Sequence, residues 1–151
     1  MQTFTNAVVS EAGAGHMAFG FGPHLIRMTA DDTGGTYGVL EVDMPAGEGP
    51  PLHVHEREEE FFRVLSGRFL FVCGDTSSEL SEGGCILLPR GVPHRFQNVG
   101  STTGRLMVIV TPGGFEGFFA AAQDAAMSDV DEIAAGFGLR FVPAISAARA
   151  A

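Results

Sequence analysis

Residues 47–67 read GEGPPLHVHEREEEFFRVLSG, a stretch in which histidines and carboxylates stand at regular spacing. His53 and His55 stand one residue apart, and a run of carboxylates ends at Glu60. Alternate residues of a strand point the same way, so the two histidines share a face, and after a short bend Glu60 can face the same side. The stretch therefore predicts two imidazoles and a carboxylate that converge.

A second stretch, residues 83–98, reads GGCILLPRGVPHRFQN and supplies a possible fourth ligand. Pro89 and Gly91 bend the chain, and His94 then points inward beside Phe96. Neutral imidazoles with one carboxylate suit Fe, Mn, Co, Ni, Cu or Zn rather than Ca or Mg. We therefore expect one divalent transition metal ion, with coordination positions left open for catalysis.

The composition is that of one acidic, foldable domain. The 151 residues are 45% hydrophobic and 18% charged, which is enough apolar surface for a core. Nine basic residues against 18 acidic ones give a net charge of -9, which disfavours nucleic acid as a partner. All nine are arginine, which excludes lysine Schiff-base and P-loop chemistry. Cys73 and Cys85 are expected to be small core residues without a disulfide.

Short segments rich in Val, Ile, Leu, Phe and Thr, separated by Gly and Pro, predict an all-β fold. Within residues 36–44 the acidic Glu41 and Asp43 share one face, and the apolar residues share the other. Strands with one buried face close into a barrel or stack as a jelly roll. The predicted strands are 7–10, 16–21, 24–29, 36–44, 59–65, 68–73, 85–88, 94–98 and 104–111, and the predicted turns are 32–35, 66–67, 74–75 and 82–84.

After Pro112 apolar residues recur at three- and four-residue intervals, which predicts a helix over 114–125. Its phenylalanines would pack on the barrel or on a dimer partner. Ser128, three residues before Asp131, resembles a capping box for a second helix, which a glycine ends before a short segment at 139–142. The expected organisation is one domain over 1–151, with a barrel core at about 34–112, a helical extension at about 113–142 and a frayed tail at 144–151.

The two stretches resemble the two signature motifs of the cupin family, with all ten signature residues present at the family spacing. The ten residues are Gly47, His53, His55, Glu60, Gly67, Gly83, Pro89, Gly91, His94 and Asn98. The resemblance to single-domain cupins covers most of the chain and is strongest to quercetin-dioxygenase-like proteins. It implies an all-β double-stranded β-helix, the jelly-roll cupin barrel, with one or two short C-terminal helices.

The resemblance also implies a metal site of three histidines and one glutamate, at His53, His55, Glu60 and His94. Glu58 and Glu59 are rivals for the carboxylate position. Only Glu60 leaves the six-residue gap to Gly67 and has an inward-facing set of apolar residues behind it. Glu58, like Glu56, is interpreted as part of a solvated acidic turn.

Three functions fit this site. By resemblance to quercetinases, the first is a dioxygenase acting on a flavonol-like or other enolic or aromatic small molecule, with Glu60 as metal ligand and catalytic base. The second is a metal-dependent isomerase of a small keto compound, and the third is a non-catalytic binding cupin. His16 and His24 are interpreted as rim or surface residues. The expected substrate pocket is apolar and is lined by Leu40, Val42, Phe62, Val64 and Phe96.

The expected partners are a small molecule and a second copy of the chain. Small one-barrel cupins resemble homodimers, in which an N-terminal strand at 7–10 or 16–21 pairs with the partner's sheet. We expect neither nucleic acid nor membrane as a partner. Neither a signal peptide nor an apolar transmembrane run is apparent, which favours a cytoplasmic protein.

Overall fold

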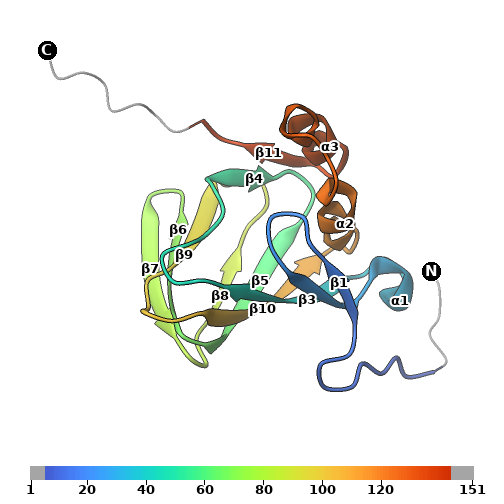
Figure 1. Cartoon of the computed structure of the whole chain (residues 1–151), viewed down its shortest axis with the longest axis horizontal. Helices are drawn as coiled ribbons and strands as arrows, with labels where there is room; N and C mark the ends of the chain where they lie inside the picture. Colours follow the sequence, from blue (N-terminus) through green and yellow to red (C-terminus); the bar gives the residue numbers. More distant parts are fainter. Residues whose placement is uncertain (1–5, 144–151) are drawn as a thin grey trace, which may run out of the picture.

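Two antiparallel sheets face each other in the computed structural model, which describes residues 6–143 (Figure 1). The six-stranded sheet runs, in spatial order, β1 (His16–Ala18), β2 (His24–Met28), β3 (Gly38–Met44), β10 (Gly104–Thr111), β5 (Glu59–Ser66) and β8 (Cys85–Leu88). The five-stranded sheet runs β11 (Leu139–Phe141), β4 (His53–His55), β9 (His94–Asn98), β6 (Arg68–Cys73) and β7 (Thr76–Ser81). This arrangement confirms the predicted all-β jelly roll.

The core lies between the inward faces of the two sheets. On β3, Leu40 and Val42 are buried while Asp43 points to solvent, as the alternation predicts. The same period of two makes every second residue of β5 and β9 face inward. Four phenylalanine rings fill the middle of this space, with centroids 5.3 to 6.4 Å apart: Phe62, Phe69, Phe71 and Phe96.

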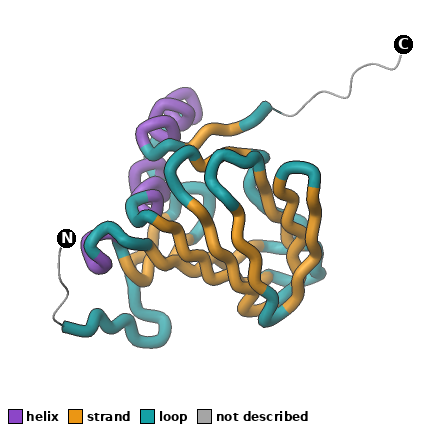
Figure 2. Tube along the Cα trace, turned by 180° about the vertical axis from the view of Figure 1, so that it is seen from behind, coloured by secondary structure: helices purple, strands orange, loops and turns teal. Residues whose placement is uncertain are grey.

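The helices lie together on one side of the barrel (Figure 2). They are α1 (Ala30–Thr33) before β3, then η1 (Phe115–Gly117), α2 (Phe118–Ala122), η2 (Met127–Asp129) and α3 (Val130–Gly136) after β10. The helix predicted over 114–125 is therefore a 3-10 turn followed by a short α-helix. Its rings Phe115 and Phe118 are buried and stacked at 5.5 Å, so this segment packs on the barrel.

After α3 the chain returns to the barrel rather than leaving it. β11 pairs antiparallel with β4, so that Leu139 lies opposite His55 and Phe141 lies opposite His53. The expected helical extension at 113–142 thus also supplies an edge strand to the sheet that carries two signature histidines. The tail expected at 144–151 lies outside the described residues.

Several local predictions were wrong. Residues 7–10 form no strand, and the turn predicted at 32–35 is present only at Gly34 and Gly35, because residues 32 and 33 belong to α1, which Thr29 and Asp32 cap. The capping box predicted at Ser128 is absent, because Asp129 is the N-cap of α3 and makes no capping bond. β7 was missed because it has one apolar residue in six, so no alternation marks it.

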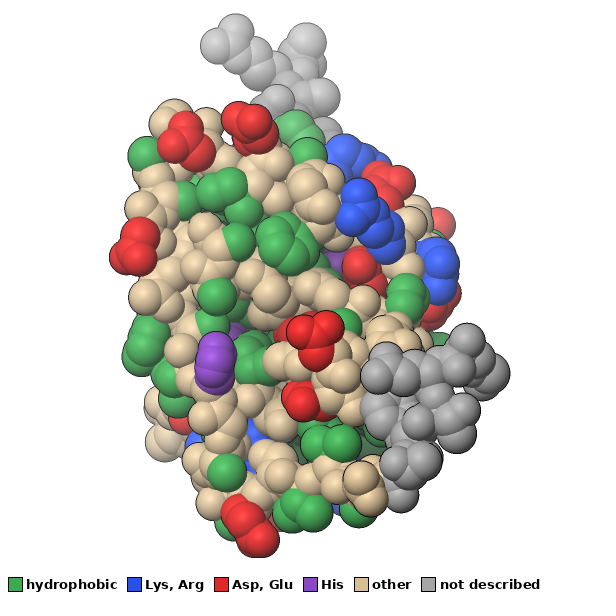
Figure 3. All heavy atoms as spheres, turned by 90° about the vertical axis from the view of Figure 1, so that its right-hand side faces the viewer, with side chains coloured by type: hydrophobic (Ala, Val, Ile, Leu, Met, Phe, Trp, Pro, Cys, Tyr) green, Lys and Arg blue, Asp and Glu red, His purple; other side chains and the backbone are tan. Residues whose placement is uncertain are grey.

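Both cysteines are free, as expected, and Cys73 packs against the core whereas Cys85 is not a core residue. Cys85 is exposed on β8, and Cys73 is only partly buried at the end of β6. On the face shown in Figure 3, apolar side chains are scattered among polar and charged ones. Within residues 6–143 no helix is long and apolar enough to cross a membrane.

Candidate metal centre

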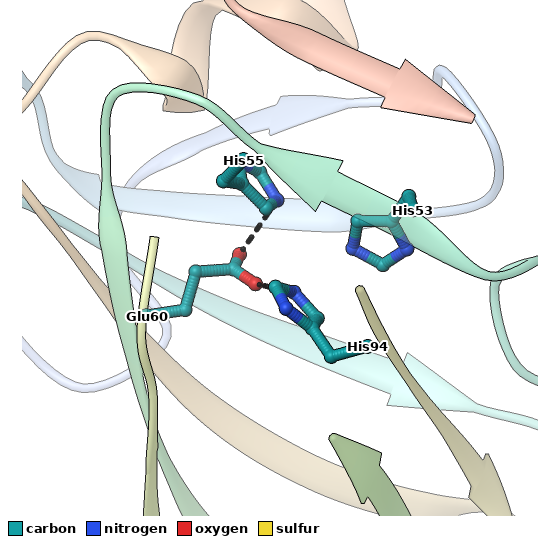
Figure 4. A group of neighbouring side chains, drawn as sticks. All are labelled: His53, His55, Glu60 and His94. Carbon is teal, nitrogen blue, oxygen red and sulfur yellow. Dashed lines mark hydrogen bonds and ion pairs between the residues drawn. The ribbon is translucent and has the colours of Figure 1, made fainter. Parts of the chain in front are cut away.

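Four polar side chains point toward one another between the two sheets (Figure 4). His53 and His55 come from β4, His94 comes from β9 of the same sheet, and Glu60 comes from β5 of the facing sheet. Their ligand atoms all lie within 4.8 Å of one another. The side chains are buried, with exposed fractions of 7%, 1%, 1% and 5% in that order. The predicted convergence is confirmed.

Strand pairing explains why the histidines meet. His53 lies directly opposite His94 in the β4–β9 ladder, and their rings are 4.6 Å apart. The bend before β9 is tied to β4, because the Gly91 amide donates to the His55 carbonyl at 2.8 Å. Gly91 has a φ of 77°, a conformation that glycine adopts at little cost. The second signature stretch therefore fixes the position of His94 relative to the two histidines of the first stretch.

The carboxylate is Glu60 rather than its neighbour Glu59. Glu60 continues the inward set that includes Phe62, whereas Glu59 points outward and forms a 2.6 Å ion pair with Arg90. Consecutive residues of a strand face opposite sides, so only one of the two can enter the site. The choice made from the gap to Gly67 agrees with this geometry.

Two of the imidazoles are fixed by backbone carbonyls. His53 Nδ1 donates to the Pro51 carbonyl at 2.8 Å, and His94 Nδ1 donates to the Val92 carbonyl at 3.0 Å. A carbonyl oxygen only accepts, so in each neutral ring Nδ1 carries the hydrogen and Nε2 keeps its lone pair. Both rings therefore present Nε2 as the atom available to a metal.

The third imidazole is fixed by Glu58, which the sequence analysis placed in a solvated turn. Glu58 is only 4% exposed, and its Oε2 accepts from His55 Nδ1 at 3.3 Å. Glu58 has the same even-numbered, inward parity as Glu60. This parity, and not the acidic character of residues 56–60, indicates where its side chain lies. Glu56 is exposed and pairs with Arg140 at 3.2 Å, as expected for a solvated carboxylate.

The oxygens of Glu60 lie 3.4 Å from His55 Nε2 and 2.9 Å from His94 Nε2. The shorter contact is a hydrogen bond, so without a metal ion a proton lies between His94 Nε2 and Glu60, and a bound ion would take the place of this proton. Burial acts to raise the pKa of Glu60, but the charge of His55 and the hydrogen bond with His94 lead the opposing effects, which outweigh burial and hold the pKa below its usual range. Burial lowers the pKa of His53 to about 4. Burial also acts on His55, but the carboxylates of Glu60 and Glu58 outweigh it and raise its pKa.

This donor set fits a transition metal ion. The site offers three imidazole Nε2 atoms, on rings held in place by hydrogen bonds from Nδ1, and one buried carboxylate. Fe, Mn, Co, Ni, Cu and Zn accept such ligands, whereas Ca and Mg prefer oxygen. The four residues could therefore hold one such ion. A divalent ion with a single carboxylate ligand keeps a net charge of about +1, which attracts an anionic oxygen.

We call the four residues His53, His55, Glu60 and His94 the metal cluster, although they are protein ligands and not metal ions. A cavity of about 210 Å³ opens beside this cluster. His53, His55 and Glu60 line it, as do four of the five predicted wall residues: Leu40, Val42, Phe62 and Phe96. Val64 is the exception, because it lies one inward position beyond Phe62, where the core rings close the space. With an exposed fraction of 1%, Val64 is a core residue and not a wall residue.

The rest of the wall was not predicted from the sequence. Five further phenylalanines line the cavity: Phe21, Phe115, Phe118, Phe119 and Phe141. Phe115 contacts the cluster directly, with its ring 4.3 Å from the His55 ring and perpendicular to it. The helix periodicity identified three of these residues as packing on the barrel, but it gave no sign that they enclose a cavity.

Of the two histidines outside the motifs, one was placed wrongly. His16 is exposed on β1, as expected. His24 is only 6% exposed and lines the cavity, so it is not a rim or surface residue. Its parity with the buried Ile26 on β2 was the signal that could have shown this.

Residues 40–110 match the family model described as Cupin domain. Among curated proteins, the chain is 37% identical over 88 residues to Protein SchB of Streptomyces halstedii, covering 58% of this chain and 62% of that protein. It is 32% identical over 76 residues to Germin-like protein 3-7 of Oryza sativa subsp. japonica, covering 47% and 33%. The chain thus spans less than two thirds of each of these relatives.

Solved structures share the fold. The structure of KdgF from Halomonas sp. matches with a TM-score of 0.56 at 17% identity, covering 62% of this chain and 82% of that one. An uncharacterized conserved protein with a double-stranded β-helix domain from Klebsiella pneumoniae matches with a TM-score of 0.53 at 20% identity, covering 60% and 76%. Both structures therefore share the fold of this chain.

Proposed function

We propose that this chain is a metal-dependent cupin dioxygenase that acts on an enolic or aromatic small molecule of the flavonol type. The observation that carries the proposal is the contact between the two parts of the site. With a divalent ion bound, the four-residue site would carry a net positive charge. This site lies directly against a cavity lined by phenylalanines. An acidic phenol or enol fits both parts, because its oxygen suits the ion and its ring suits the walls.

The chain's own residues would prepare the reaction. His53, His55 and His94 would hold the ion, which when bound supplies a Lewis acid and, if redox-active, a route for electrons from substrate to dioxygen. Glu60 would accept the proton of the substrate hydroxyl, because its carboxylate lines the cavity beside the three histidines.

The phenylalanines would orient the substrate and keep water away from it. Phe115 lies edge-on to His55, and Phe118 and Phe119 continue the wall on the side of the helices. Dioxygen is apolar and enters such a cavity more readily than water does. The aromatic wall therefore favours reaction of a bound aromatic anion with dioxygen over its reprotonation.

The test is turnover of flavonols and smaller phenolic enols under ¹⁸O₂, with metal content measured on the same samples. We expect oxygen uptake that requires metal and a product that carries two labelled oxygen atoms. Glu60→Gln should lower turnover per bound metal by about 10²- to 10⁴-fold, the usual contribution of a general base. Glu59→Gln is the matched control, since Glu59 points to solvent, and it should keep its turnover.

Two results would contradict the proposal and would identify the other functions that the sequence allows. Conversion of a small keto compound at equal rates with and without oxygen would indicate an isomerase. A metal-loaded protein that is stabilised by these ligands but forms no product would indicate a binding cupin.

A further inference from the structure

His24 stands out on the cavity wall because of its chemistry. Apart from His53, His55 and Glu60, it is the one lining residue within 6–143 whose side chain can make a strong hydrogen bond. The others are glycine, proline, aliphatic or phenylalanine, together with Met44, whose sulfur is a weak acceptor. A polar group alone on an apolar wall is the kind of group that selects a ligand.

The free atom of this imidazole is Nε2. His24 Nδ1 donates to the Gly22 carbonyl at 2.9 Å, so the neutral ring keeps a lone pair on Nε2. Nε2 has no hydrogen-bond partner among the described residues. Within the same residues no fully buried side-chain nitrogen or oxygen lacks a partner, so Nε2 must reach open space. The side chain is only 6% exposed and lines the cavity, so a ligand in the cavity is the group that could reach Nε2.

The ring is also fixed in orientation and charge. It stacks on Phe119 with centroids 3.6 Å apart and planes inclined by 17°. Its backbone is held in the sheet opposite Val42. Burial lowers the pKa of His24 to about 4, so the imidazole is neutral at physiological pH and Nε2 is an acceptor, not a donor.

His24 and the metal cluster lie at different ends of the cavity. The strand order β2-β3-β10-β5 separates His24 from Glu60 by three strand spacings. At about 4.8 Å per spacing this is roughly 14 Å along the sheet, before the side chains reach inward. The side chains reach inward from both strands and shorten this distance, and two fused or linked rings with an oxygen at each end are of a suitable length to connect them.

We propose that His24 is a specificity-determining residue that accepts a hydrogen bond from a second hydroxyl of the substrate, at the end of the cavity away from the metal cluster. The substrate class is then an aromatic diol or polyphenol of at least two rings. This inference rests on the proposed function, in that the substrate's first oxygen is taken to lie at the cluster.

Binding of matched naphthalene ligands tests the proposal on zinc-loaded protein. The ligands are 1-naphthol, 2-naphthol and the dihydroxynaphthalene isomers, measured by titration calorimetry. We expect at least one diol to bind about tenfold more tightly than either naphthol, as one additional hydrogen bond in a buried site allows. In His24→Phe this preference should fall to about one. In the control His16→Phe, altered at an exposed site, it should persist.

A second readout uses the wild-type protein and does not depend on how a variant folds. Long-range ¹H–¹⁵N correlation spectra should show His24 Nε2 unprotonated in the free protein. The preferred diol should shift this nitrogen resonance, and 2-naphthol should leave it in place.

The outcomes separate the two proposals. If the naphthols bind but no diol is preferred, or if the preference survives in His24→Phe, the role of His24 is refuted while the aromatic pocket stands. If neither naphthols nor diols bind the zinc-loaded protein, the proposed substrate class fails, and the inference about His24 fails with it.

Discussion

At the residue scale, Glu58, Glu59 and Glu60 show how one position along a strand changes the role of an identical side chain. Glu60 enters the metal cluster, Glu59 pairs with Arg90 at the surface, and Glu58 is buried against His55. A carboxylate that accepts from the Nδ1 of a metal-binding histidine fixes the ring and makes Nε2 more basic. Glu58 is therefore a positioning residue for His55.

Glu58→Gln should weaken metal binding by about 10- to 100-fold, the usual loss when such an outer carboxylate is removed. Competition with a chelator of known affinity measures this change. Glu56→Gln is the control, because Glu56 lies in the same acidic run but is exposed, and its affinity should stay at the wild-type value. Equal affinities for all three proteins would contradict the role assigned to Glu58.

His24 predicts a dependence of stability on pH. Its pKa is lowered from 6.5 to about 4 by burial, so between these values the unfolded chain binds a proton that the folded protein does not. The contribution of His24 is therefore fully present above pH 6.5 and is lost as the pH falls, by about 2 kcal/mol between pH 7 and pH 5. Urea unfolding of metal-free protein should show a smaller loss over this range in His24→Phe than in the wild type. Equal losses would show that His24 does not titrate in this way.

The sequence could predict those site residues for which neighbouring residues show to which face of the sheet the side chain points. The His53, His55, Glu60 and His94 spacings are local, so strand parity suffices to bring them together. Phe141 and His24 enter the cavity from segments far away in the sequence, and no local pattern reports which segments meet.

At the element scale, the strands that were predicted are those with one apolar face. β3, β5, β9 and β10 alternate clearly, whereas β7 has Leu80 as its one apolar residue and was missed. Its partner β6 holds it in place through six paired positions, an interaction that its own residues do not reveal. The role of Asn98 could not be predicted from its neighbours in the sequence either. Its buried side-chain amide donates to the carbonyls of Met44 and Thr102 and so holds the loops after β3 and β9 together.

At Gly49 the first signature stretch approaches the backbone of β9 so closely that there is no room for a side chain. A Cβ at this position would overlap the Phe96 carbonyl and lie 2.9 Å from Gln97 Cα, and both of these are backbone atoms that cannot turn away. Gly49→Ala should therefore lower the free energy of unfolding by an amount on the order of 3 kcal/mol. Gly136→Ala, where a Cβ meets nothing within 4 Å, is the control and should leave stability close to the wild-type value. Equal denaturation midpoints for the two variants would contradict this packing.

At the scale of the whole molecule, the site joins the two sheets. Three ligands come from the five-stranded sheet and Glu60 comes from the six-stranded one, so a bound ion would connect both layers. The wall residues of β11 and α2 complete the cavity from outside the two signature stretches. The barrel and its metal cluster follow from the motifs, while the shape of the cavity depends on the packing of the whole chain.

Assembly stays a prediction. β1 is an edge strand of the six-stranded sheet, and its Met17 is 46% exposed. Edge strands offer unpaired backbone groups to another chain, so we expect a homodimer through this edge rather than through residues 7–10. Light scattering at micromolar concentration should give twice the mass of 15.9 kDa, and a monomeric mass would refute the expectation.

Metal content is the most direct test of whether His53, His55, Glu60 and His94 bind an ion. Untagged protein purified without chelators should carry about one equivalent of a single transition metal by mass spectrometry, in line with one cluster of four ligands. The His53→Ala/His94→Ala double variant should lose this metal, while the exposed-site variant His16→Ala should keep it. Protein without metal that also fails to take up Fe, Mn, Co, Ni, Cu or Zn, or a double variant that keeps its metal, would contradict the account.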